Sequence, residues 1–446
     1  MLVSMLLALL MAPFVLSGCA AHALGSRQNA PVSTALPAPE TSPLVNLVQA
    51  KAKFYPNESG FYPLIDGETA LRARTALADT AVRSLDVQYY IWRNDQTGRL
   101  ILSRILDAAE RGVRVRILID DIHKGEDRSL LKALDRHPLV EIRLFNPAST
   151  GSQGLGMITR GMEMVLDYGR LTHRMHNKLY LVDSSLLIVG GRNIGNEYFD
   201  LNDEKNFRDL DVLVAGPAAK RFGKVFDTYW NAEASVPVNE PGENLKGRDS
   251  LDWAALRKQF DAAAEDQMVL PVLEPEKSYP WLVTRVNRMI WAPYRILAAS
   301  PDIVHDDEAE TFGDQLLKLP EPETELLLET AYFIPSRALV RKFREWRKKG
   351  VKTRILTNSM RSNDVLAAHA GYAKHREDVL TAGADLYEWR SDNQPAKSKH
   401  KKGVLASRAN LHTKAYVIDR EYSFVGSYNL DPRSSKAGSS PTCSSA

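Results

Sequence analysis

The chain has 446 residues, with 58 Lys and Arg against 55 Asp and Glu and a formal net charge of +3 at pH 7. A balance so close to neutral does not indicate a protein that binds nucleic acid through bulk charge, and we expect no nucleic-acid partner. The length favours two domains or two halves over a single core. Only two cysteines are present, which excludes a disulfide framework or a cysteine-built metal site for the bulk of the chain.

The N-terminal residues combine a signal-like segment with one of these cysteines. Residues 2–16 form an apolar run that is too short to span a membrane. The run ends in Leu16-Ser17-Gly18-Cys19, which resembles the lipobox of bacterial lipoproteins. The resemblance implies that residues 1–18 are a signal peptide and that the Cys19 thiol is acylated. Acyl chains would then anchor the mature chain to a membrane of the bacterial cell envelope, facing the periplasm. An ordinary secretory signal with a chance cysteine is the alternative.

The segment after Cys19 is rich in Ala, Pro and Ser, a composition typical of a flexible tether, and we assign residues 19–45 to it. Beyond it the chain divides into two halves joined by a segment rich in Pro and acidic residues. We expect a first domain over residues 46–236, a connecting segment that packs in part over 237–318, and a second domain over 319–446.

The first half contains a strand–helix–strand unit. Residues 84–91 predict a strand, and the apolar residues between 102 and 109 recur at the spacing of one helix face. Gly112 is placed to end this helix, and residues 113–119 predict the next strand.

The second half repeats this unit. A strand is predicted over residues 326–334, then a helix that includes Leu339 and Phe343, then Gly350, and then a strand over 351–356. Strands that alternate with helices favour an α/β fold, and we expect one largely parallel sheet in each half.

A short polar motif also occurs twice. The first copy is His176-Asn177-Lys178, then Asp183, then Gly190-Gly191-Arg192-Asn193. The second copy, with the same spacings, is His412-Thr413-Lys414, then Asp419, then Gly426-Ser427-Tyr428-Asn429. A single copy would most often contain a surface histidine or a core histidine. Two copies in a repeated α/β unit indicate a functional site.

The residue types in this motif suit phosphoryl chemistry. On a strand, residues i and i+2 point to one face, so the His and Lys of each motif project together. Histidine can act as a nucleophile or proton carrier near neutral pH, and lysine provides positive charge for phosphoryl oxygens. A glycine-containing turn lets the backbone and an Asn amide approach a phosphate closely.

These motifs are the HKD signature, and most of the chain resembles the phospholipase D superfamily, particularly the bacterial cardiolipin synthases of the cardiolipin synthase C group. The stretches that carry the narrower resemblance are residues 85–92, 174–178, 190–195, 356–359, 363–365, 368–373 and 424–434. The resemblance implies two phospholipase D-like α/β/α repeats packed about a pseudo-two-fold axis, with both motifs in one cleft.

The resemblance also implies an enzyme, a phosphatidyltransferase that forms cardiolipin from phosphatidylglycerol and a second phospholipid through a phosphohistidine. Its catalytic residues would be His176, Lys178, Asp183, His412, Lys414 and Asp419, with Asn193 and Asn429 binding the phosphate. By family analogy His176 is the nucleophile and His412 the general acid, although the sequence alone leaves their order open. No metal or other cofactor is implied, and the expected partners are anionic phospholipids and the membrane surface.

Two other functions remain open from the sequence. The same signature occurs in phospholipase D-type hydrolases and in nucleases, in which water replaces the acceptor alcohol. The non-catalytic alternative is a lipoprotein that only binds anionic lipid.

The two halves differ after their motifs. The first half continues through residues 207–211, which resemble the strand after the first motif in the family and which we interpret as structural. It goes on to an amphipathic segment at 222–230. Residues 434–446 contain no aromatic residue and no aliphatic residue larger than Ala. We therefore expect the second repeat to be truncated at its C terminus, a lesion that would leave a sheet edge uncovered and impair folding or activity.

Overall fold

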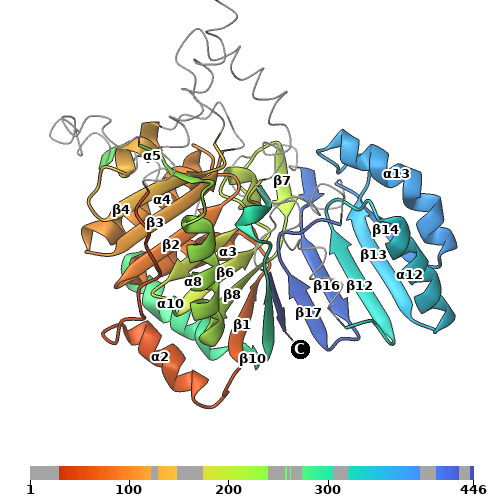
Figure 1. The fold of residues 1–446 in the computed structure, drawn as a ribbon, viewed down its shortest axis with the longest axis horizontal. Coiled ribbons are helices and arrows are strands. Elements are labelled where there is room, and N and C mark those ends of the chain that lie inside the picture. Colours follow the sequence, from red (N-terminus) through yellow and green to blue (C-terminus); the bar gives the residue numbers. More distant parts are fainter. Residues whose placement is uncertain are drawn as a thin grey trace, which may run out of the picture.

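A computed structural model describes residues 30–121, 129–147, 174–239, 257–258, 262, 274–304, 320–391, 408–430 and 442–445. These residues form two α/β lobes that lie side by side, the first built mainly from the N-terminal half and the second mainly from the C-terminal half (Figure 1). Within this part of the chain no helix is long and apolar enough to cross a membrane.

The first lobe is organised around a mixed sheet. In spatial order its strands are β10 (Ile290–Ala292), β1 (Ser59–Leu64), β8 (Asp211–Ala215), β6 (Leu186–Gly190), β5 (Leu179–Val182), β2 (Ser84–Tyr89), β3 (Arg114–Asp120), β4 (Val140–Phe145) and β9 (Ser235–Pro237). Strands β2, β3 and β4 run parallel, and the other described pairings in this sheet are antiparallel. The expectation of a largely parallel sheet is therefore wrong. Helical crossovers join β2 to β3 to β4, but the motif strand β5 enters as an antiparallel hairpin with β6.

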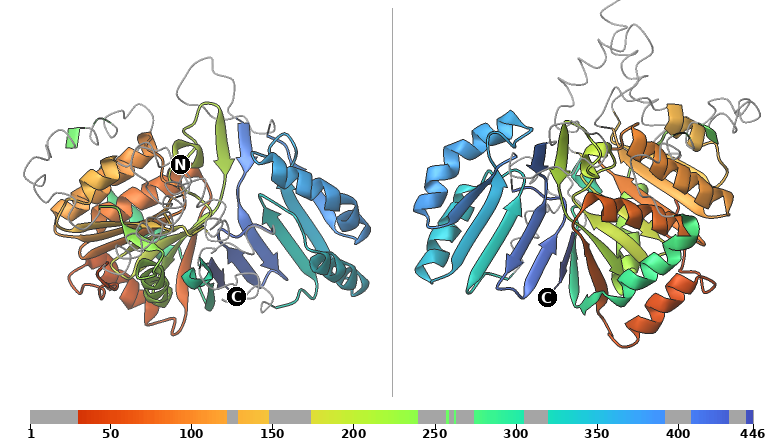
Figure 2. Two further views of the ribbon diagram at one scale, coloured as in Figure 1. Left: turned by 45° about the horizontal axis from the view of Figure 1, so that its top comes forward. Right: turned by 180° about the vertical axis from the view of Figure 1, so that it is seen from behind.

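Helices cover both faces of this sheet. They are α2 (Pro43–Ala52), α3 (Gly67–Thr80), α4 (Gln96–Glu110), α5 (Ser129–Leu134), α8 (Pro217–Trp230) and α10 (Pro275–Asn287), with a short 3-10 helix at Asn196–Tyr198. Side chains of α3, α4 and α10 share one core cluster, and those of α8 belong to another. The first lobe therefore has three layers, as the view from behind also shows (Figure 2).

The ends of α4 follow from local sequence. The Asp95 side chain accepts the N–H of Gly98 at 3.0 Å and so caps the helix at its start. Gly112 follows the helix with φ +97°, a left-handed conformation that glycine adopts without strain. Gly350 has φ +86° after the corresponding helix of the second lobe. Both predicted helix ends are confirmed.

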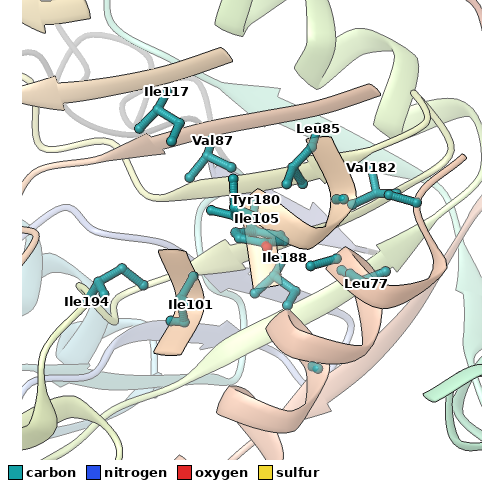
Figure 3. Packing of buried hydrophobic residues seen from close by; sticks show 14 of the residues in the cluster. Leu77, Leu85, Val87, Ile101, Ile105, Ile117, Tyr180, Val182, Ile188 and Ile194 are labelled. Atoms are coloured by element: carbon teal, nitrogen blue, oxygen red, sulfur yellow. The ribbon is translucent and has the colours of Figure 1, made fainter. Parts of the chain in front are cut away.

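The core between the helices and the sheet contains aliphatic side chains from several elements (Figure 3). Leu77 of α3 and Ile105 of α4 are fully buried against Val87 and Ile188 of the sheet. Truncating one such side chain to Ala costs about 2–5 kcal/mol in a typical core, because the cavity closes only in part. This packing fixes β2 and β6, and β5 is held between them by its pairing with both strands.

The second lobe repeats the central part of this architecture. Its strands are, in spatial order, β11 (Tyr294–Leu297), β18 (Thr442–Ser445), β17 (Tyr422–Val425), β16 (Lys414–Ile418), β12 (Glu325–Thr330), β13 (Lys352–Asn358) and β14 (Asp385–Trp389). Helices α12 (Arg337–Lys348) and α13 (Leu366–Thr381) cover one face of this sheet (Figure 1). The order β14-β13-β12-β16-β17-β18-β11 matches β4-β3-β2-β5-β6-β8-β1 of the first lobe, which confirms the repeat.

The last described strand corrects one expectation about the second repeat. Residues 442–445 form β18, which pairs antiparallel with β17 on one side and with β11 on the other. It holds the place that β8 holds in the first lobe, so the edge of β17 is paired and not uncovered. Strand pairing uses only main-chain N–H and C=O groups. A short strand of Thr, Cys and Ser can therefore pair with β17 without a large side chain.

The described part of the predicted connecting segment belongs to both lobes. Helix α10 packs on α3, and β10 extends the first sheet beside β1. Pro293 follows, and then β11 forms the edge of the second sheet. A 3-10 helix at Pro301–Val304 ends this part.

Residues 30–42, which fall within the predicted tether, are held against the first lobe. The N–H of Ser33 donates to Asn231 Oδ1 at 3.1 Å, and its carbonyl accepts from Arg116 at 3.0 Å. Arg116 is 1% exposed and also donates to Asp227 at 2.8 Å. The structure corrects the prediction of a flexible tether for these residues, because side chains of β3 and α8 satisfy their backbone groups.

Candidate active site

The two motifs meet at the junction between the lobes. Strand β7 (Lys205–Arg208) of the first lobe pairs in parallel with β15 (Arg408–Leu411) of the second (Figure 1). The N–H of His412 donates to the carbonyl of the last residue of β7 at 2.7 Å. In the other direction, the His176 imidazole hydrogen-bonds the main chain of Ser427 in the second motif. Each histidine therefore contacts the opposite lobe.

His412 is bound through its ring to a carboxylate of the first lobe. Its Nδ1 lies 2.5 Å from Oδ2 of Asp209, whose side chain is fully buried. Burial alone would raise the pKa of Asp209, but the charge and hydrogen bond of His412, helped by Lys414 and Arg192, outweigh burial and lower it. Asp209 is thus a carboxylate that accepts the Nδ1–H of His412. The other ring nitrogen, Nε2, becomes the atom that can exchange a proton with a substrate.

Aromatic side chains of the first lobe complete the surroundings of His412. The Tyr198 ring lies edge-on with its centroid 5.4 Å from that of the imidazole, and the Phe207 ring lies at 5.0 Å. Burial, followed by the charge of Lys414, lowers the pKa of His412, whereas Asp209 opposes this shift. The resting ring is therefore neutral, and it gains a proton most readily when negative charge enters the site.

His176 lies three residues before the start of β5 and is partly exposed. The Tyr90 ring packs against it with centroids 4.6 Å apart. Burial lowers the pKa of His176 well below its ordinary value, and the charges of Lys178, Lys414 and His412 lower it further. Groups from both motifs thus act on one imidazole, which remains unprotonated and suited to nucleophilic attack.

The two motif lysines are buried beside their histidines, each 1% exposed. Lys178 Nζ donates to the carbonyl of His176 at 2.7 Å, and Lys414 Nζ donates to the carbonyl of His412. Burial and the charge of Lys414 lower the pKa of Lys178 well below its ordinary value. An anionic phosphoryl group between the lysines would relieve this repulsion.

The two motif asparagines lie in the site but in different environments. Asn193 accepts the N–H of Ile91 at 3.2 Å and donates to the Tyr198 hydroxyl at 2.9 Å, so its amide positions the aromatic wall of His412. Asn429 is 5% exposed, and its Oδ1 has no hydrogen-bond partner among the described residues.

The two motif aspartates do not join the histidines. Asp183 follows β5 and accepts the N–H groups of Val82, Arg83 and Ser84 at 2.7–3.0 Å. Ser84 begins β2, whereas the Tyr90 ring beside His176 lies just after its end, about 20 Å away at the rise of an extended strand.

Asp419 repeats this arrangement in the second lobe. It accepts the N–H groups of Glu323, Thr324 and Glu325 at 2.7–2.8 Å. We therefore correct the catalytic assignment of Asp183 and Asp419: each anchors the start of the strand beside its motif.

Asp209 is a site residue that the sequence interpretation misses, because it gives residues 207–211 a structural role. The signal that points to it is weak: Asp209 and Asp211 precede and open an otherwise apolar strand. Cys19 lies outside the described residues. Among those described, no group of three or more His, Cys, Asp or Glu side chains is placed to hold a metal ion.

Two α/β lobes that bring one His-x-Lys motif each to a common junction define a phospholipase D-type site. A solved structure described as phosphatidylserine synthase from Haemophilus influenzae Rd KW20 has a TM-score of 0.53 and 14% identity, over 89% of this chain and 85% of that chain. This similarity supports the fold alone.

Sequence comparison identifies the family. The family model described as cardiolipin synthase, PLD-like domain, matches residues 75–230 and 317–438, more than half of the chain. Cardiolipin synthase C of Escherichia coli K12 is 37% identical over 387 residues, covering 85% of this chain and 80% of that protein. A cardiolipin synthase of Oceanobacillus iheyensis is 22% identical over 85% of this chain and 64% of that protein. The chain belongs to the cardiolipin synthase family of the phospholipase D superfamily and is a phosphatidyltransferase of that superfamily.

Proposed function

We propose that this chain forms cardiolipin by transferring the phosphatidyl group of one phospholipid to a hydroxyl of phosphatidylglycerol, through a phosphohistidine. The observation that carries the proposal is the pair of histidines from opposite lobes, one kept unprotonated beside two lysines and one hydrogen-bonded to a buried carboxylate. A nucleophile and a proton carrier are the two groups that a double-displacement reaction at phosphorus requires.

In the first step, a ring nitrogen of His176 attacks the phosphorus of the donor lipid. The bond from phosphorus to the headgroup oxygen breaks, and Nε2 of protonated His412 gives its proton to that oxygen. Asp209 stabilises the protonated ring before this transfer. Lys178 and Lys414 neutralise charge on the phosphoryl oxygens.

In the second step, a hydroxyl oxygen of phosphatidylglycerol attacks the phosphorus and the bond to His176 breaks. The hydroxyl proton passes to Nε2 of His412, which regenerates the protonated ring used in the first step. Water in place of the alcohol would give phosphatidic acid, so transfer and hydrolysis differ only in the acceptor.

Product analysis with phosphatidylglycerol vesicles and the full chain tests this proposal. We expect cardiolipin as the main product and a covalent lipid–protein adduct in wild type, and no adduct in His176→Ala. His412→Ala should lose transfer, because the proton that releases the headgroup is missing. His375→Ala, a partly exposed histidine on α13, is the matched control and should retain wild-type turnover. Phosphatidic acid without cardiolipin would favour the hydrolase, and lipid binding without turnover would favour a non-catalytic lipoprotein.

We also propose that the chain is anchored by acylation of Cys19 and faces the periplasm. The support is the sequence Leu16-Ser17-Gly18-Cys19 after an apolar run. Cells fed a labelled fatty acid should incorporate the label into wild type and not into Cys19→Ser. Equal labelling of both proteins would exclude this anchor.

A further inference from the structure

A second carboxylate of the site, Asp364, lies in the loop before α13. Its Oδ1 accepts the hydroxyl of Tyr332 at 2.7 Å, and its Oδ2 lies 3.4 Å from Nζ of Lys205. Lys205 belongs to β7 of the first lobe, so this cluster bridges the lobe junction as the two histidines do. The Asp364 side chain is 24% exposed and remains accessible to a ligand.

This cluster adjoins the wall of His412. Lys205 Nζ lies 4.7 Å from the centroid of the Phe207 ring, and that ring lies 5.0 Å from the imidazole of His412. Burial would raise the pKa of Asp364, but the hydrogen bond from Tyr332, then Lys205 and His412, outweigh burial and lower it. Asp364 is therefore ionised and within electrostatic range of the proton-carrying histidine.

The charges of the site are divided between its two sides. The ammonium groups of Lys178 and Lys414 act on His176, which suits the phosphoryl group. Lys414 also acts on His412, but only on that side do carboxylates, Asp209 and Asp364, oppose its effect on the pKa of the ring. An ionised carboxylate only accepts hydrogen bonds, so the group bound there must be a donor.

We propose that Asp364, placed by Lys205 and Tyr332, is the subsite that binds the hydroxyl groups of the acceptor's glycerol headgroup. One hydroxyl would donate to Asp364 while its neighbour presents its oxygen to phosphorus and its proton to His412. Because a monohydric alcohol has no second hydroxyl to donate, the subsite selects polyols. This inference rests on the proposed transferase reaction.

The experiment uses the full chain with phosphatidylglycerol in detergent micelles and offers labelled glycerol and ethanol as competing acceptors. The products are labelled phosphatidylglycerol, phosphatidylethanol and, from water, phosphatidic acid. Asp364→Ala should lower the ratio of the glycerol product to the ethanol product about tenfold, because a hydrogen bond to a charged group is lost. The KM for glycerol should rise while formation of phosphatidic acid continues.

Two further variants, Tyr332→Phe and Asp385→Asn, show whether a change in the product ratio is specific to Asp364. Tyr332→Phe should lower the same ratio less, since it leaves the carboxylate in place. Asp385→Asn, at the exposed start of β14, is the control and should leave the ratio unchanged. An unchanged ratio in both Asp364→Ala and Tyr332→Phe would overturn the subsite. Absence of any alcohol product from wild type would overturn the proposed transferase instead.

Discussion

Oδ2 of Asp209 and Nδ1 of His412 lie 2.5 Å apart although the two residues belong to different lobes. The contact exists because β7 and β15 pair in parallel and end side by side. A proton carrier from one repeat is therefore oriented by a carboxylate from the other, and neither half of the chain contains the dyad alone.

Asp209→Asn tests this dyad. The substitution keeps the shape but removes the charge that raises the pKa of His412, so that pKa should fall further. Because protonated His412 is needed to release the headgroup, the alkaline limb of the pH–rate profile should shift to lower pH. Turnover should fall on the order of 100-fold or more. A profile superimposable on that of wild type would show that Asp209 does not act on the histidine.

Lys414→Met tests whether the two motifs share one site. The charge of Lys414, in the second lobe, lowers the pKa of His176 in the first. Its removal should therefore raise the pKa of His176, which NMR of ¹³C-labelled histidine can follow. Lys205→Met, which removes a lysine at the same junction, should leave this pKa near its wild-type value. Equal titration of His176 in wild type and Lys414→Met would argue for separate sites.

The motif aspartates should affect stability and not chemistry. Asp183→Ala removes the acceptor of three N–H groups, those of Val82 and Arg83 before β2 and that of the buried Ser84 at its start, and we expect a loss of about 1–3 kcal/mol. In Asp419→Ala the corresponding groups are more exposed and water can replace the carboxylate, so about 0.5–1 kcal/mol is expected. Urea unfolding gives the stabilities, and turnover per folded molecule should stay near wild type. A specific loss of turnover would restore a catalytic role.

Asp419 also predicts a pH effect. Burial opposes ionisation of Asp419, but its backbone hydrogen bonds to Glu323, Glu325 and Thr324 outweigh burial and lower its pKa from 3.8 to about 2. A group with a lowered folded pKa stabilises the fold above its unfolded pKa and loses that contribution as pH falls through the folded value. The stability difference between wild type and Asp419→Ala should therefore shrink between about pH 4 and pH 2. A difference that stays constant over this range would contradict the assignment.

Much of the architecture could be predicted from sequence because it depends on local signals. Hydrophobic periodicity predicted the strands and helices around Gly112 and Gly350, and the repeated spacing of His176 and His412 predicted a joint site. The prediction of a largely parallel sheet in each half was wrong, because hydrophobic periodicity does not show whether two successive strands are joined by a helical crossover or by a hairpin. The role of Asp209 depends on a contact between the repeats, which no local pattern encodes.

The buried ion pair of Arg74 and Asp211 offers a test of the first lobe. Arg74 Nη2 lies 2.9 Å from Asp211 Oδ2, and both side chains are at most 1% exposed. Arg74→Met removes the guanidinium that balances the buried carboxylate of Asp211. We expect the free energy of unfolding, measured with urea, to fall by about 3–5 kcal/mol. Adding Asp211→Asn removes the unbalanced carboxylate charge and should recover part of the lost stability. A double variant less stable than the sum of the single changes would contradict this explanation.

The segment Ile290–Leu297 gives one edge strand to each sheet, with Pro293 between them. As a result, the unit that was duplicated in the sequence is not an autonomous folding unit. A first-half fragment that ends before α10 would keep the pairing of β1 with β8 but lose β10 from the edge of the sheet and α10 from α3. Separately expressed halves should therefore assemble only when one of them carries this segment.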